Sequence, residues 1–160
     1  MSRIGITGHS TLTAETTQLV AGALHEVLAA RADRTLVGVS CLARGADQLF
    51  ARAVLELGGE LEVVLPSADY RRHKVKADNA ATFDELLSRA SAVCTLPFES
   101  SNRESYLAAN EHMLSIVDSV VAVWDGRPPE RPGSTGDVVE RARALQLPVA
   151  VVWPEGAERT

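Results

Sequence analysis

Short apolar segments of strand length recur along the chain. They are rich in valine and mostly continuous rather than alternating, which is typical of strands that are covered on both faces. The segments are RIGIT (3–7), TLVGV (35–39), LEVVLP (61–66), AVCTL (92–96), SVVAVW (119–124) and PVAVVW (148–153).

Segments with helical periodicity lie between these runs. Over residues 14–31, apolar side chains from Leu19 onward repeat at i, i+1, i+4, i+5, i+8 and i+9, which predicts one apolar stripe facing a sheet. Residues 45–57 repeat this pattern, and two glycines follow as a helix stop. A third helix is predicted near 102–116.

Two capping boxes mark further predicted helix starts. Thr82 with Glu85, and Ser101 with Glu104, have the spacing at which a hydroxyl and a carboxylate each accept a hydrogen bond from a backbone amide of the first turn.

Strand and helix thus alternate about six times. This alternation predicts a single α/β domain over 1–160, with a doubly wound, mainly parallel sheet of about six strands and helices on both faces. Ligands of such sheets bind beyond the carboxyl ends of the strands, so the loops that follow each strand are the candidate sites.

Composition and charge narrow the function. The 160 residues are 46% hydrophobic, and the net charge of −5 with 16 scattered basic residues argues against nucleic acid as the partner. There is no apolar run long enough to span a membrane and no secretory leader, so we expect a cytoplasmic protein without a membrane partner. The two cysteines have no neighbouring ligands at zinc spacing, so no metal site and no separate cofactor are expected.

The loop after the first strand, TGHST (7–11), is one candidate site. Gly8, His9 and Ser10 resemble half of a dinucleotide fingerprint, because the chain has G-x-x-G from Gly5 instead of G-x-G-x-x-G. Two interpretations stay open here: a phosphate contact, or a tight turn with Gly8 at a positive φ.

The loop after the second strand leads into the helix of 45–57 through Arg44, Gly45 and Asp47. Arg44 is a candidate for holding a phosphate and Asp47 for holding a ribose hydroxyl, while Gly45 allows a close approach of backbone or ligand. A surface arginine and a first-turn aspartate that complements the helix dipole would explain the same residues.

The strongest candidate follows the fifth strand, in the stretch RPGSTGDVVERARAL (131–145). The residues at this helix start are Gly133, Ser134, Thr135, Gly136 and Asp137. Small side chains and hydroxyls beside unpaired helix amides predict an anion site. Alternatively, Ser134 or Thr135 simply caps the helix and Asp137 complements its dipole.

Two further features concern the pocket rim. Asn110 shares a helix face with Tyr106, Met113 and Val117. Two interpretations of Asn110 stay open: a core amide that the backbone satisfies, or a hydrogen-bond donor to a ligand at the pocket rim. The long basic segment 66–79 is a candidate lid, with Arg71 and Arg72 as its contacts to an anionic ligand.

The segments GITGHS, LARGADQLFARA, SYLAANEHMLSIVDSVVAVWDG and PGSTGDVVERA, in this order, resemble the SLOG superfamily, which includes the Lonely Guy (lysine decarboxylase-like) phosphoribohydrolases and the DNA-processing protein A family. The Lonely Guy signature is P-G-G-x-G-T-x-x-E. Pro132, Gly133, Gly136 and Glu140 match it, whereas Ser134 and Asp137 depart from it. The resemblance implies a Rossmann-like fold and a nucleotide-like ligand whose phosphate lies on the glycine turn.

The resemblance also implies two functions. The first is a nucleotide-binding protein, a ligand sensor or carrier. The second is a phosphoribohydrolase that cleaves the N-glycosidic bond of nucleoside monophosphates, with Glu140 as the catalytic acid. Ala109 stands where those enzymes have an arginine, which Arg44 or Arg103 would have to replace. Related proteins pair, so we expect a homodimer.

Overall fold

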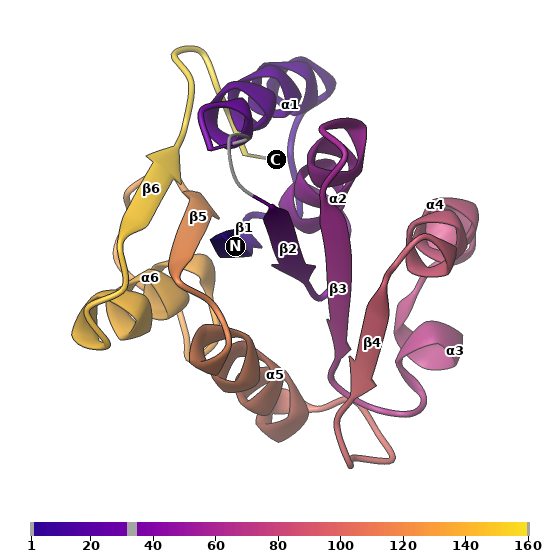
Figure 1. The fold of residues 1–160 in the computed structure, drawn as a ribbon. Helices are drawn as coiled ribbons and strands as arrows, with labels where there is room; N and C mark the ends of the chain where they lie inside the picture. Colours follow the sequence, from indigo (N-terminus) through magenta and orange to yellow (C-terminus); the bar gives the residue numbers. More distant parts are fainter. Residues whose placement is uncertain (1, 32–34, 160) are drawn as a thin grey trace.

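Figure 1 shows the fold in a computed structural model that describes residues 2–31 and 35–159. A six-stranded, all-parallel sheet with strand order β4-β3-β2-β1-β5-β6 forms its centre, which confirms the predicted α/β fold. Its strands are β1 (Ser2–Gly8), β2 (Leu36–Ser40), β3 (Glu60–Leu65), β4 (Ala92–Thr95), β5 (Ser119–Val123) and β6 (Val149–Val152).

The strand order reverses once, between β1 and β5. From β1 the chain proceeds outward through β2 and β3 to β4, and it then returns to pair β5 with the other side of β1. Because consecutive loops leave in opposite directions at this point, a crevice opens beyond the carboxyl ends of β1 and β5.

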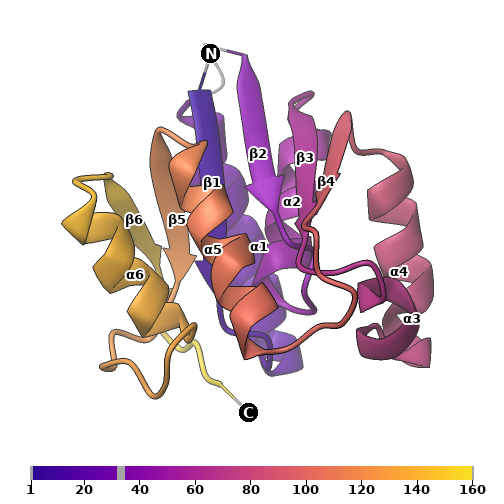
Figure 2. The same ribbon diagram turned by 90° about the horizontal axis from the view of Figure 1, so that it is seen from below.

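Helices cover both faces of the sheet (Figures 1 and 2). They are α1 (Ala14–Ala29), α2 (Ala46–Glu56), α3 (Tyr70–Lys74), α4 (Ala77–Ser88), α5 (Arg103–Ser115) and α6 (Thr135–Ala144). The helices α1 and α2 pack on one face, and α5 and α6 on the other, while α4 packs against β3 at the edge.

The core explains why the strands are continuous apolar runs. Val121 and Val123 of β5 face the α1–α2 layer, whereas Val120 of the same strand faces α5 and α6. Each of these three valines is fully buried, so consecutive positions of the strand are covered by one layer or the other.

The predicted helix starts are the least accurate part of the sequence analysis. Thr82 lies inside α4, whose N-cap is Lys76, so that capping box is wrong. At α5 the box exists but is displaced by one residue: Asn102 is the N-cap and Ser105 the reciprocal partner. Ser101 is engaged elsewhere, because its amide and hydroxyl both contact Asp69.

Candidate functional site

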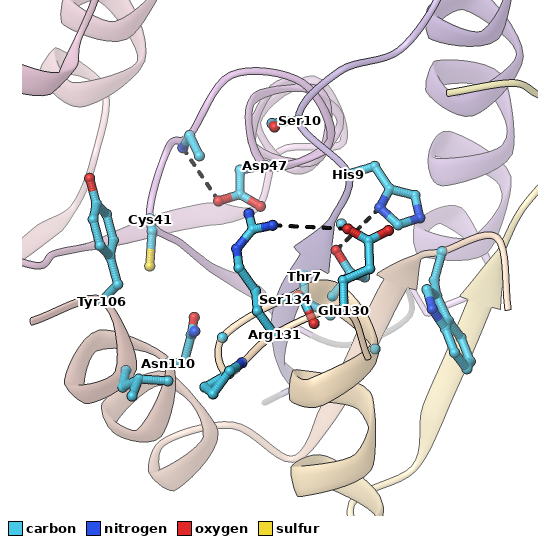
Figure 3. A pocket seen from close by; sticks show the side chains of 18 of the residues that line it. Thr7, His9, Ser10, Cys41, Asp47, Tyr106, Asn110, Glu130, Arg131 and Ser134 are labelled. Atoms are coloured by element: carbon cyan, nitrogen blue, oxygen red, sulfur yellow. Dashed lines mark hydrogen bonds and ion pairs between the residues drawn. The ribbon is translucent and has the colours of Figure 1, made fainter. Parts of the chain in front are cut away.

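A cavity of about 550 Å³ occupies the crevice at the strand-order reversal (Figure 3). Its walls come from the loops after β1, β2 and β5, from α5, and from the first turn of α6. Cys41 and Tyr106 lie on one side of the pocket and His9 on the other.

Most of the candidate residues meet in this cavity. Those that line it are Gly8, His9, Ser10, Asp47, Asn110, Gly133, Ser134, Thr135 and Gly136. Those that do not are Arg44, Gly45, Asp137 and Glu140.

The first turn of α6 carries hydrogen-bond donors that face the pocket. The amide of Gly133 donates to Asp137 Oδ2 at 2.7 Å, and that of Ser134 to the Arg131 carbonyl at 3.1 Å, so these two donors are occupied. In the described part of the chain, the amides of Thr135, Gly136 and Asp137 have no acceptor. The expectation of a wholly unoccupied 133–137 turn is thus corrected to three available amides.

Ser134 supports the anion-site interpretation over simple capping. It is the N-cap residue of α6, with extended backbone (φ −66°, ψ 165°), yet its hydroxyl makes no capping bond. The Ser134 hydroxyl oxygen is buried and has no hydrogen-bond partner within the described residues. An unsatisfied buried hydroxyl costs about 1–3 kcal/mol, which a ligand or an ordered water at this position would recover.

Asp137 faces away from the cavity. Its carboxylate accepts from the Gly133 amide and from Arg141 Nε at 3.1 Å, and thus closes the turn and pairs with the next helical turn. The prediction that Asp137 contacts the ligand is therefore not supported by its position. The same geometry keeps its negative charge from pointing at an anion in the pocket.

His9 connects the first loop to this helix start. The Asp125 amide donates to His9 Nε2 at 3.1 Å, so that nitrogen is an acceptor and the proton of the neutral ring is on Nδ1. Nδ1 faces the Thr135 hydroxyl at 3.4 Å, and the ring packs edge-on against Trp153. Burial, with Arg159 nearby, lowers the His9 pKa and favours the neutral form. The Thr135 hydroxyl proton therefore stays available to a ligand.

The glycines of the first two loops have a packing role. A Cβ on Gly8 would lie 2.5 Å from Ala46 Cβ and 2.8 Å from Val123 Cβ, so no side chain fits. Gly8 is not among the positive-φ residues, so the turn interpretation was wrong about its backbone. Gly45 has a φ of +89°, and its Cβ would lie 2.8 Å from the His9 carbonyl oxygen. Gly45 thus allows the close approach of the His9–Ser10 backbone, as predicted, although Gly45 itself does not line the cavity.

A half-buried carboxyl forms part of the pocket lining. Asp47 Oδ2 accepts from the Ala43 amide at 3.3 Å, and the residue lines the cavity. Burial raises the pKa of Asp47 to about 7. Burial also raises the pKa of the neighbouring Cys41 thiol far above its usual range, which keeps that thiol protonated.

Four arginines line the pocket: Arg103, Arg127, Arg131 and Arg159. Only Arg103 was named from the sequence, as a replacement for the arginine of the Lonely Guy enzymes. Arg159 is engaged by Asp125 and Glu130, and Arg127 is near Asp125. Arg131 is 70% exposed with only a 3.9 Å contact to Glu130, and Arg103 has no ion-pair partner in the described chain. Arg131 and Arg103 are thus cations that a ligand can reach.

Arg71 and Arg72 do not act as the expected lid. Arg71 forms a two-pronged pair with Asp84 at 2.6 and 2.8 Å, and neither arginine lines the cavity. The segment folds into α3 and the start of α4 instead of an open loop. Arg44 is also outside, paired with Asp78.

Glu140 is separated from the other candidates. It is exposed on α6, whereas the adjacent Val138 and Val139 and the following Ala142 are buried against the sheet. Glu140 lies about one helical turn beyond the first turn of α6 and does not line the cavity. Its carboxylate is therefore not in the position of a catalytic acid for a ligand whose phosphate binds at that first turn.

Neither a metal-binding cluster nor a membrane-spanning helix occurs among the described residues. Over 2–31 and 35–159 there is no group of three or more histidine, cysteine, aspartate or glutamate side chains arranged to hold a metal ion. Within those same residues, every helix is too short or too polar to cross a bilayer.

Neither known protein families nor curated proteins match the sequence. Solved structures do match its fold. DNA processing protein A from Streptococcus pneumoniae has a TM-score of 0.69 at 17% identity, over 98% of this chain and 52% of that chain. The Helicobacter pylori protein, described by its single-stranded DNA binding mode, has a TM-score of 0.69 at 19% identity, over 99% and 68%.

The molybdenum cofactor binding protein of Rippkaea orientalis has a TM-score of 0.60 at 17% identity, over 96% of this chain and 77% of that chain. Of the S. pneumoniae DNA processing protein A, in contrast, the chain spans only about half the length. At these identities the matches establish the fold. The chain shares the Rossmann-like fold of these proteins, which the sequence predicts.

Proposed function

We propose that the protein binds a nucleotide or nucleotide derivative, as a ligand sensor or carrier, with a phosphate on the first turn of α6. The carrying observation is that, among residues 2–31 and 35–159, three amides of this turn and the buried Ser134 hydroxyl have no protein partner at the strand-order reversal. Helix amides and the positive end of the helix dipole together favour an anion at this position.

The surroundings fit such a ligand. Arg131 and Arg103 supply positive charge beside the helix start, and Tyr106, which is 39% exposed, offers a ring face on the α5 wall. A cavity of about 550 Å³ is within the size range of small-molecule sites. The walls combine apolar side chains such as Leu107 and Trp124, which suit a base, with polar groups, and the helix start suits the phosphate.

The structural neighbours extend the panel of ligands to test. One of them binds single-stranded DNA and another the molybdenum cofactor, so oligonucleotides and cofactors both belong beside mononucleotides. The acidic charge of this chain favours the smaller ligands over duplex nucleic acid. The homodimer stays a prediction, which sedimentation equilibrium would test.

Amide NMR tests the placement of the phosphate. Titration with AMP should shift the Thr135 and Gly136 amide resonances most, because these donors would bind the phosphate oxygens. Calorimetry across mononucleotides, dinucleotides, cyclic nucleotides and short oligonucleotides measures affinity. No binding across this panel, or binding that leaves both amides unshifted, would refute the proposal.

An arginine substitution tests the electrostatic contribution. Arg131→Ala should weaken AMP binding about tenfold, because a charge-assisted hydrogen bond to phosphate contributes about 1.5 kcal/mol or more. Arg89→Ala is the matched control: Arg89 is 48% exposed, pairs with Glu85, and does not line the cavity. Equal losses in the two variants would show that general charge, and not this site, determines the affinity.

A further inference from the structure

A second hollow, of about 230 Å³, adjoins the first. Ser10 and Tyr70 line both, so the two hollows meet at these side chains. The other wall of the second hollow comes from the end of α3 and the start of α4, which lie side by side in both ribbon views (Figures 1 and 2).

This hollow is basic. Arg44, Lys74 and Lys76 line it. Arg44 is paired with Asp78, but Lys74 and Lys76 are exposed and have no ion-pair partner among the described residues. The backbone at Val75 and Lys76 is extended, and Val75 packs into the core cluster around Phe83, which holds the two lysines at the rim.

The hollow also has donors that are not lysines. Lys76 and Asn79 place it at the N-terminal end of the 12-residue helix α4, where the helix dipole favours an anion. Tyr70 is only 7% exposed, and its hydroxyl has no hydrogen-bond partner in the described chain. Tyr70 lines both hollows, so its hydroxyl is a donor that a ligand at their junction can use.

We propose that this second hollow binds a second phosphate of the same ligand, so that the ligand carries two phosphates, one at the α6 first turn and one between Arg44, Lys74 and Lys76. The inference rests on the proposed function. Because the two hollows are distinct and share only two lining residues, the two phosphates belong to different nucleotides of a linear, phosphodiester-linked dinucleotide. Adjacent phosphates of a diphosphate would both lie in the first cavity.

Calorimetry with three ligands separates the two sites: AMP, the 5′-phosphorylated dinucleotide pApA, and ADP-ribose. The double variant Lys74→Ala/Lys76→Ala should lose at least tenfold in affinity for pApA and change less than twofold for AMP and ADP-ribose. Tyr70→Phe, which removes only the hydroxyl, should also weaken pApA selectively. The control Arg72→Ala/Arg89→Ala removes the same charge outside both hollows and should alter none of the affinities.

The outcomes are distinct. An unchanged pApA affinity in the lysine variant, or an equal loss for AMP, would overturn the second site while leaving the first intact. A loss confined to ADP-ribose would also overturn the proposal, because it would place a diphosphate, and not the second phosphate of a dinucleotide, beside the two lysines. A wild-type protein that binds none of the three ligands would overturn the proposed function itself.

Discussion

Replacing Asp47 with asparagine should stabilise the protein at neutral pH, because the native carboxyl ionises in an enclosed position. Its pKa is raised from 3.8 to about 7, with burial as the main cause and the Ala43 amide as the opposing one. A raised carboxyl pKa means that the folded state binds the proton more tightly than the unfolded state. The contribution of Asp47 to stability is therefore greatest below about pH 4, falls as pH rises through the interval to about 7, and is level above it.

The difference between the pKa values of Asp47 in the unfolded and folded states sets the size of the stability change. About three pKa units at about 1.4 kcal/mol each give an upper value of about 4 kcal/mol lost between pH 4 and pH 8. Because one side of Asp47 faces the cavity, water there reduces the penalty, and we expect about 2–4 kcal/mol. Asparagine keeps an oxygen for the Ala43 amide and cannot ionise, so the fall should disappear.

Urea unfolding of both proteins at pH 4, 6 and 8 measures this difference. Asp47→Asn should match the wild type at pH 4 and exceed its unfolding free energy at pH 8. Asp84→Asn is the control: Asp84 is an exposed carboxylate with its pKa lowered by the Arg71 pair, so this variant should gain nothing at pH 8. Parallel pH profiles for the wild type and Asp47→Asn would refute the assignment of Asp47 as an enclosed carboxyl.

Other substitutions test packing, an ion pair and the Glu140 position. Gly8→Ala should lower the unfolding free energy by about 1–3 kcal/mol through overpacking, whereas Gly22→Ala, which meets nothing on the exposed side of α1, should raise it by about 0.5–1 kcal/mol in thermal unfolding. Glu62→Gln should cost about 1 kcal/mol at pH 7, because Arg3 lowers the pKa of this carboxyl, and the cost should vanish as pH falls through that lowered pKa in urea titrations. Glu140→Gln should leave AMP affinity unchanged by calorimetry, since Glu140 lies outside the cavity; a tenfold loss would contradict that placement.

The fold was predictable because its signal is repeated. Each of the predicted strands overlaps an observed strand. The central strands β2 and β5 are buried on both faces and must be apolar at consecutive positions, whereas the edge strand β4 is apolar although it is exposed. Cap positions carry a weaker signal. Ser101–Glu104 and Asn102–Ser105 are overlapping patterns, and what decides between them is the tertiary contact of Ser101 with Asp69.

The candidate site was predictable where it depends on glycines and strand ends, and unpredictable where it depends on long side chains. Gly133 and Gly136 could be located from the helix start that follows β5. Arg131 could not, because neither a periodicity nor a motif determines where an arginine in a loop will point, and Arg103 was named only as one of two replacements for a missing arginine, with Arg44 as the other. Arg44 was an equally good candidate in the sequence. In the structure it forms an ion pair with Asp78, 34 residues later, and lies outside the cavity.

The carboxylates of α6 favour binding over hydrolysis. Two acids occur in this helix near the turn, and each is placed where it does not meet the cavity: Asp137 closes the turn through the Gly133 amide and Arg141, and Glu140 faces solvent. Stabilising positive charge on a sugar requires a carboxylate beside the bond that breaks, whereas holding a phosphate requires donors. Among the described residues, the start of α6 has amide donors without acceptors at the pocket, whereas its two carboxylates lie outside the pocket. A helix start that binds phosphate needs this arrangement.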